Sequence, residues 1–454
     1  MTHLYSSTGI AKHIVMQIPD LFKLITVVII FAVASLTASA TDLISIHQQA
    51  RENDPVFKRA AAAQQMALES RQQSQAQLLP TLVFNAQISD YSQDVISGTA
   101  LLFARKSQGY SLTLTQPIYH RENFVRLDQA DAEIAQAKAT FAAAEQELII
   151  RTAQLYFDAL AAKDNLDFSR AEKNALERQL EQTRQRFDVG LIAITDVHEA
   201  RAAYDLVAAQ DIEAENLLNS QFEALHELTN HDYKNLAVLG DTLELVSPDP
   251  ADINSWSQQA LNNNLALLAQ HLATQIAQDN IKISRAGHFP QLDLNANHTY
   301  ADSSGGNFGA RETRDNTVSL QLTVPLYQGG AVQSQTRLAT AQYDQAVETL
   351  EQQKRSTIRQ ARDGYRGVLA ATKRVNALLQ AVISAQSALK ASQAGLEVGT
   401  RTTVDVLEAR RNLYRAQRNL ARARYDYILF SLQLKQVSGQ LQLSDLEHVN
   451  RWLQ

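Results

Sequence analysis

One segment of this chain occurs twice: EVGTRTTVDVLEAR covers residues 397–410, and DVGLIAITDVHEAR covers residues 188–201. Both copies carry Val-Gly and Asp-Val pairs at the same spacing, and both end in Glu-Ala-Arg. Only the later copy has an arginine in the turn that follows the glycine, Arg401. Because self-similarity at a fixed separation is the signature of a repeated architecture, the pair predicts that a larger unit is duplicated.

The similarity extends over nearly the whole chain. LLPTLVFNAQISDY at residues 78–91 matches HFPQLDLNANHTY at 288–300, and TQPIYHREN at 115–123 matches TVPLYQGGA at 323–331. The separation stays near 210 residues throughout. We therefore expect two structural repeats, residues 41–240 and 255–440, joined by a linker at 241–254 and followed by a short tail at 441–454.

The N-terminal region, residues 1–40, has the pattern of a secretory signal peptide. Lysines precede an apolar run from Leu24 to Leu36, and Ala38-Ser39-Ala40 fits the small-residue cleavage rule. The run is shorter than the roughly 20 residues that a membrane-crossing helix needs. Cleavage before Thr41 is the prediction, and a membrane anchor is the alternative.

Composition points to a helical protein and excludes several functions. The 454 residues include only 8 Pro and 16 Gly, with long tracts of helix-forming residues. A net charge of −6 makes the chain a poor partner for nucleic acid. There is no Cys, no phosphate-binding glycine loop, no HExxH and no nucleophile elbow. We expect no enzyme activity, no cofactor and no metal site.

Each half contains a pair of amphipathic strands. Leu82, Phe84, Ala86 and Ile88 alternate with polar residues, and a second strand alternates from Tyr110 until it stops at Pro117. Strands of about ten residues, apolar on one face, are typical of transmembrane β-barrels, although an ordinary sheet on a soluble core has the same alternation. Polar loops are expected at Ser92–Gln108 and Ala301–Asn316. Prolines mark the boundaries between helices and strands: Pro80, Pro117, Pro290 and Pro325.

Very long helices are expected after the strands, ending near Asp188 and Glu397. About 70 residues at ~1.5 Å each extend about 100 Å. Four strands cannot close a barrel, since about eight is the minimum, so several chains must share one, and three would give twelve strands. A structural coiled coil in the periplasm without a pore is the alternative.

The combination resembles the TolC family of outer-membrane efflux channels. The residues that carry the resemblance are VGTRTTVDVLEAR (398–410), ARARYDYILFSLQLKQVSG (421–439), QRFDVGLIAITDV (185–197) and VPLYQGG (324–330). The resemblance covers essentially the whole chain after the signal peptide. It implies a mainly α fold with a long helical coiled-coil barrel, and a homotrimer whose twelve-stranded β-barrel lies among outer-membrane lipid. The helical tunnel would cross the periplasm, girdled by residues of about 231–256 and 440–454.

The resemblance also implies how such a channel works. It would export small molecules or proteins, in multidrug export or type I secretion, together with an inner-membrane efflux transporter and a periplasmic adaptor. The channel itself would catalyse nothing. The cargo and the identities of the pump and adaptor stay open.

The repeated segment has the features of a helix-turn-helix tip. Gly190 and Gly399 are suited to a left-handed position after a helix. Thr402 and Asp405 have the spacing of a capping box, and Thr195-Asp196 is a comparable helix start. Both glycines and Thr402 are explained by turn formation alone.

The charged residues of the tips gain a role from the resemblance. It implies that Arg401 links one tip to Thr195 and Asp196 of the neighbouring subunit and so closes the periplasmic entrance. Leu396 stands where the family has a tyrosine of this network, which puts that link in doubt. Asp405 and Glu408 match a carboxylate pair that rings the constriction, where six carboxylates would favour cations. Acids that complement a helix dipole are the alternative.

An arginine stripe on the last long helix has two interpretations. Its members lie three or four residues apart, so they share one face: Arg411, Arg415, Arg418 and Arg422. Such a stripe is typical of a solvated or salt-bridged face. Docking of the adaptor is the alternative.

Overall fold

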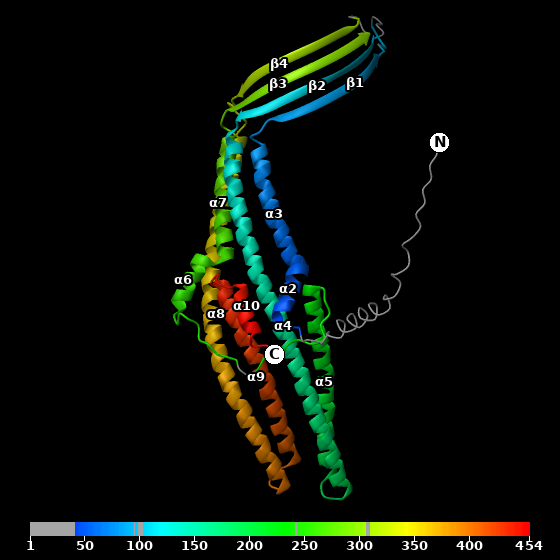
Figure 1. Ribbon diagram of the computed structural model, residues 1–454, viewed down its shortest axis with the longest axis vertical. Coiled ribbons are helices and arrows are strands. Elements are labelled where there is room, and N and C mark those ends of the chain that lie inside the picture. Colours follow the sequence, from blue (N-terminus) through cyan, green and yellow to red (C-terminus); the bar gives the residue numbers. More distant parts are fainter. Residues whose placement is uncertain (1–40, 95, 99–102, 241–242, 306–308) are drawn as a thin grey trace, which may run out of the picture.

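The computed structural model describes residues 41–94, 96–98, 103–240, 243–305 and 309–454. The expected signal peptide, residues 1–40, lies outside the described residues. A β-sheet forms one end of an elongated molecule, and long helices run from it to two turns at the opposite end (Figure 1). Among the described residues, no helix combines the length and the apolar character needed to cross a membrane.

Two helices, α2 (Leu43–Asn53) and α3 (Pro55–Ala76), precede the sheet. The helical stretch is interrupted between them at Asp54. The Asp54 carboxylate accepts hydrogen bonds from the amides of Val56 and Phe57, which makes it the N-cap of α3. Pro55, with no N–H to donate, occupies the first position of α3, where that loss costs nothing.

The sheet has four antiparallel strands in chain order, β1 (Thr81–Gln93), β2 (Phe103–Tyr119), β3 (Gln291–Gly305) and β4 (Arg311–Thr323). Cross-strand pairs such as Leu82↔Leu114 and Phe84↔Leu112 continue the apolar face from one strand to the next. On the other face, the hydroxyls of Thr113 and Thr115 donate to Asn297 and Asn295. The predicted pattern of one apolar and one polar face is present.

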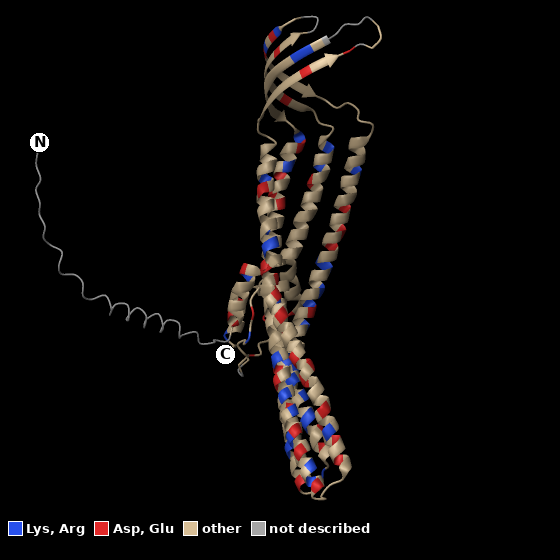
Figure 2. Ribbon diagram, turned by 90° about the vertical axis from the view of Figure 1, so that its right-hand side faces the viewer, with Lys and Arg blue, Asp and Glu red and all other residues tan. Residues whose placement is uncertain are grey.

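The strands are longer than the alternation predicted. About half of Ser92–Gln108 and most of Ala301–Asn316, expected as loops, belong to strands, with pairs such as Arg105↔Gly305 and Ala301↔Thr313. Alternation of apolar and polar residues reveals only the part of a strand that has an apolar face. Backbone pairing between strands continues through polar residues. Charges gather in these outer ends of the strands (Figure 2).

The four prolines lie at element boundaries with one exception. Pro80 and Pro290 directly precede β1 and β3, and Pro325 follows β4. Pro117 was expected to end its strand but lies inside β2, which continues to Tyr119. The pairing register shifts between Pro117 and Tyr119, and such a bulge tolerates a residue that cannot donate to the ladder.

Two long helices lead away from the sheet, α4 (Arg121–Asp188) and α8 (Ala331–Glu397). Between the sheet and the middle of the molecule they run alongside α7 (Leu265–Ala286). Between the middle and the tips they run alongside α5 (Ile194–Thr229) and α9 (Thr403–Val437). Near the sheet the helices pack in the order α3–α4–α7–α8, and near the tips in the order α5–α4–α9–α8. Both layers are therefore open, with α8 at one edge.

The main core lies halfway along the helices. Its largest side chains are at most 1% exposed: Leu43, Ile46, Tyr156, Phe157, Leu160, Leu225, Ile428 and Leu446. Each such side chain stabilises the fold by roughly 1.5–3 kcal/mol. The Tyr156 hydroxyl donates to the carbonyl of Ala237, which ties the segment between the repeats to this core.

The segments expected to girdle the tunnel pack beside this core. Residues 231–240 and 243–252 belong to neither a helix nor a strand, although Leu239 forms an isolated bridge with Leu453, and α6 (Ile253–Asn263) follows. The tail forms a short helix, α10 (Leu443–Asn450), whose Leu446 and Val449 are buried. Sequence patterns did not predict α10, because eight residues carry too little periodicity.

Candidate functional site at the helical tips

Both tips are built by the same backbone device. Gly190 follows the end of α4 with φ +77°, and Gly399 follows the end of α8 with φ +76°. The amide of Leu191 donates to the carbonyl of Arg186 at 2.9 Å, and that of Thr400 donates to Gly395 at 2.8 Å. These are Schellman motifs, in which a residue with positive φ allows the chain to satisfy the last helical carbonyls. Glycine adopts that φ without a steric penalty.

The second tip begins its next helix with a complete capping box. The Thr402 hydroxyl accepts from the Asp405 amide at 3.2 Å, and the Asp405 carboxylate accepts from the Thr402 amide at 2.8 Å. This backbone hydrogen bond is the main cause that lowers the pKa of Asp405. Asp405 is thus held as a carboxylate by its own helix start.

The first tip lacks such a cap. Helix α5 starts at Ile194 with Ala193 at the N-cap and no side-chain hydrogen bond, so the expectation that Thr195-Asp196 forms the helix start is wrong. Ala193 stands where the other copy has Thr402, and it has no hydroxyl to offer. As a result Asp196, in the first turn, makes no side-chain hydrogen bond or ion pair with any described residue.

Arg401 lies on the outside of the second tip. Its side chain is 59% exposed and its Nη1 lies 3.8 Å from Asp405 Oδ1. The aliphatic stem crosses Gly395, where a Cβ would come within 2.6 Å of Arg401 Cγ. Among the described residues of one chain, no hydrogen bond or ion pair joins Arg401 to Thr195 or Asp196. Within the described residues, Arg401 is therefore not linked to the first tip of its own chain.

Asp405 and Glu408 share the exposed side of α9. The opposite side of this helix start is buried, at Thr403, Val406 and Leu407, and Leu407 packs into a small cluster with Leu176, Ala203 and Val207 of the other hairpin. Glu408 is exposed and, within the described part of the chain, has no salt bridge. Leu396, in the last turn of α8, is half-buried and supplies no polar group.

The arginine stripe is partly neutralised by α4. Arg422 contacts Asp158 at 2.6 Å and Asp426 at 2.8 Å, and Arg418 lies 3.9 Å from the Glu172 carboxylate. Glu172 is 2% exposed, and burial raises its pKa while the surrounding arginines act to lower it. Arg411 and Arg415 have no hydrogen bond or ion pair with the described residues. Sequence reasoning missed Glu172, because nothing along α4 marks it as facing the stripe.

Apolar side chains cover the first tip, which sequence reasoning also missed. Val189 and Leu191 are 71% and 73% exposed, and Ile194 is 45% exposed. The run FDVGLIAI at residues 187–194 carried that signal. Groups of three or more His, Asp or Glu residues placed to hold a metal are absent from the described residues.

Comparison with known proteins identifies the chain. The family model described as outer membrane efflux protein matches residues 46–231 and matches again at residues 256–440. The chain belongs to the outer membrane efflux protein family. The double match falls on the two predicted repeats.

Individual members of the family agree with this assignment. Outer membrane protein TolC of Vibrio cholerae is 40% identical over 95% of this chain and 98% of its own length. The alkaline protease secretion protein AprF of Pseudomonas aeruginosa is 29% identical over 91% of this chain and 87% of its own. The CmeC outer membrane channel of Campylobacter jejuni has the same fold, with a TM-score of 0.77 at 17% identity over 91% of this chain and 90% of that one.

These findings confirm the predicted family, fold class and outer-membrane localisation. The efflux-family chain is an outer-membrane export channel, which sets aside the alternative of a periplasmic coiled coil without a pore.

Proposed function

We propose that three copies of this chain form one export channel, closing a twelve-stranded barrel and a helical tunnel, and that no chemical step is catalysed. The support comes from the open edges of a single chain. In the described sheet, β1 and β4 each pair on one side only. Unpaired strand edges are not tolerated in lipid, so these edges require other copies.

The two helical layers also have open edges that require other copies. The layer near the sheet ends in α3 and α8, and the layer near the tips ends in α5 and α8. Apolar side chains remain exposed on these edge helices: Met66, Leu68, Leu206, Ile212, Leu379 and Ile383. In the described part of the chain, the sheet and both helical layers end in edges without a partner, and this is the observation that supports the proposal. A ring of copies would close all of these edges at once.

Engineered cysteines can test this ring without interference from native cysteines, since the chain has no Cys. Leu206 and Ile383 lie about 18–20 Å from their tips along α5 and α8, at matching heights on opposite edges. Oxidation of the Leu206→Cys, Ile383→Cys variant should give a covalent trimer on a denaturing gel. Leu206→Cys with Met66→Cys, at the far end of the molecule, is the control. Cross-linked products that include no trimer band, or a control variant that cross-links equally well, would contradict the proposal.

The gate follows from this arrangement. In the ring, α5 of one copy lies beside α8 of the next, so Asp196 and Thr195 of one tip face the turn that carries Arg401 of the neighbour. Asp196 has no side-chain partner among the described residues of its own chain, and Arg401 is exposed. An arginine–carboxylate bond is charge-assisted and directional. We infer that three such links hold the periplasmic entrance closed.

The narrowest point would be lined by Asp405 and Glu408. Both project from the side of α9 that does not pack on the other hairpin. Capping keeps Asp405 ionised. Six carboxylates around one constriction would favour cations and would bind polyvalent cations that block the pore.

An inner-membrane transporter and a periplasmic adaptor would deliver the cargo. Relatives are named for protease secretion and for toluene efflux, which supports export of both proteins and small molecules here. Arg411 and Arg415, the members of the stripe that α4 leaves unpaired, are the residues available for the adaptor. Their reversal to Glu should leave trimers intact and abolish export in cells if they dock the adaptor.

A further inference from the structure

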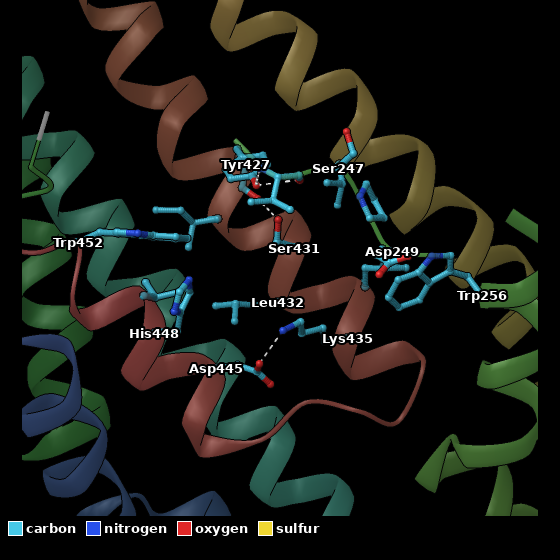
Figure 3. Close-up of a pocket in the computed structure, with 16 residues that line it drawn as sticks. Ser247, Asp249, Trp256, Tyr427, Ser431, Leu432, Lys435, Asp445, His448 and Trp452 are labelled. Carbon is cyan, nitrogen blue, oxygen red and sulfur yellow. Dashed lines mark hydrogen bonds and ion pairs between the residues drawn. The ribbon is translucent and has the colours of Figure 1, made fainter. Parts of the chain in front are cut away.

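A cavity of about 350 Å³ lies beside the main core, away from the tips. Its lining comes from residues 246–249, from α6, α8 and α9, and from α10 with the residues that directly follow it. In Figure 3 the labelled side chains of these segments converge, with Trp256 and Asp249 on one side and Trp452 and His448 on the other. We call it the girdle cavity. Its size falls within the range of about 300–1,000 Å³ that is usual for small-molecule sites.

The wall of the girdle cavity is largely apolar and aromatic, and several of its polar groups are already paired. The Tyr427 hydroxyl accepts from the Val246 amide at 2.7 Å, and Trp256 Nε1 donates to the Pro250 carbonyl at 2.8 Å. Lys435 donates to Asp445 at 2.6 Å. An uncharged hydrogen-bonding ligand would therefore find few free partners in the wall, so hydrophobic contact and ring faces must provide most of its affinity.

One charged group is left over. Asp249 is exposed at the rim and has no hydrogen bond or ion pair with any described residue. Since Lys435 and Asp445 neutralise each other, the lining carries a net negative charge from Asp249. Indole and phenol ring faces also attract cations. The Asp249 carboxylate and the aromatic ring faces thus both favour a positively charged ligand.

We propose that the girdle cavity binds a small organic cation with an aromatic or aliphatic body, seated against Trp256 and Tyr427 with its charge toward Asp249. The site is separate from the tips and does not depend on the proposed gate. A bound cation would join the linker between the repeats to α9 and α10, and would raise the melting temperature as its concentration rises.

The chain provides a selective reporter for this site. It contains two tryptophans, and both of them, Trp256 and Trp452, line the girdle cavity. Tryptophan emission of the complete channel in lipid nanodiscs is therefore emission from this cavity. Benzyltrimethylammonium, benzylsulfonate and benzyl alcohol share a ring and differ in charge, so titration with each separates cation recognition from general hydrophobic binding.

The cation should change the emission in a saturable manner and raise the melting temperature; the alcohol should do so only at several-fold higher concentration, and the anion should have no effect. Asp249→Asn should weaken cation binding about fivefold, as expected for a partly solvated ion pair. Asp249→Lys should abolish it and favour the sulfonate. Glu447→Gln, an exposed carboxylate of α10 outside the cavity, should match the unmodified protein. Equal responses to the three probes, no saturable response, or unchanged cation binding in Asp249→Lys would each overturn the proposal.

Discussion

The two tips of one chain share a backbone and differ in how their carboxylates are used. Both turn through a glycine with positive φ and a Schellman motif. In the second tip Asp405 is hydrogen-bonded to Thr402 of its own helix start, whereas in the first tip Ala193 offers no such bond, and the equivalent Asp196 has no partner within the described part of the chain. The turn is the same in both copies, and the one difference between Ala193 and Thr402 decides which carboxylate is free to meet another subunit.

The difference also extends to the surface of the tips. Both tips expose the valine before the glycine, Val189 and Val398, but the first also exposes Leu191 and the second exposes Arg401. Identical tips would place like groups against each other around a ring. Because the two tips differ, the arginine of one hairpin can lie next to the free carboxylate of the neighbouring hairpin. A closed ring of alternating hairpins requires such an arrangement.

The largest effect is expected from breaking that alternation. Arg401→Ser or Asp196→Ala should raise the open probability of the channel in planar bilayers about 10- to 100-fold, because three partly solvated links of about 1 kcal/mol each are lost together. Asp205→Ala removes an exposed α5 carboxylate whose pair, Arg201 at 3.7 Å, lies in the same helix, and it should change nothing. Unaltered conductance and open time in both tip variants would refute the link.

Charge selectivity should show the next largest effect. Asp405→Asn with Glu408→Gln should reduce the preference for cations several-fold and remove block by polyvalent cations, since the constriction loses its carboxylates. Reversal potentials in a salt gradient measure the preference. Glu213→Gln, an exposed acid farther along α5, serves as the control. If the double variant kept its cation preference, the acids would only complement the helix dipole.

Much of this arrangement could be predicted from sequence, and the exceptions have physical causes. Repeats, amphipathic strands, long helices and glycine turns depend on local patterns, so they were predictable. Alternation could not reveal the polar ends of the strands, and Pro117 was taken for a strand end because a bulge leaves no mark in the sequence. Thr195 was taken for a helix start because it is a capping residue type, yet backbone geometry places Ala193 there.

Contacts between distant segments were the least predictable. Glu172 meets the arginine stripe only because α4 packs on α9, and Trp256 and Trp452 line one cavity only because the segments that carry them pack against the same core. Neither pair has a spacing that sequence periodicity can detect. The links between subunits came from the family resemblance, since they depend on chains that pack beside this one.

Exchanging the caps should produce the smallest effect and test the comparison most directly. Thr402→Ala should weaken the start of α9 by about 1 kcal/mol, and Ala193→Thr should strengthen the start of α5 by a similar amount, through the cap hydrogen bond each loses or gains. Hydrogen exchange of peptides spanning residues 188–201 and 397–410 measures each tip separately. Ala193→Ser is a second gain-of-cap variant with a smaller side chain.

The cap exchange also carries a pH dependence. Because folding lowers the pKa of Asp405 below 3.8 through the Thr402 amide, its contribution to tip stability is present above about pH 4 and is lost as pH falls through the lowered pKa. Acid should therefore loosen the second tip of the unmodified channel, and Thr402→Ala should reduce that loosening. In Ala193→Thr, Asp196 would be drawn into the new cap and away from the neighbour's Arg401, so open probability should rise. A stabilised first tip with unchanged gating would show that Asp196 closes nothing.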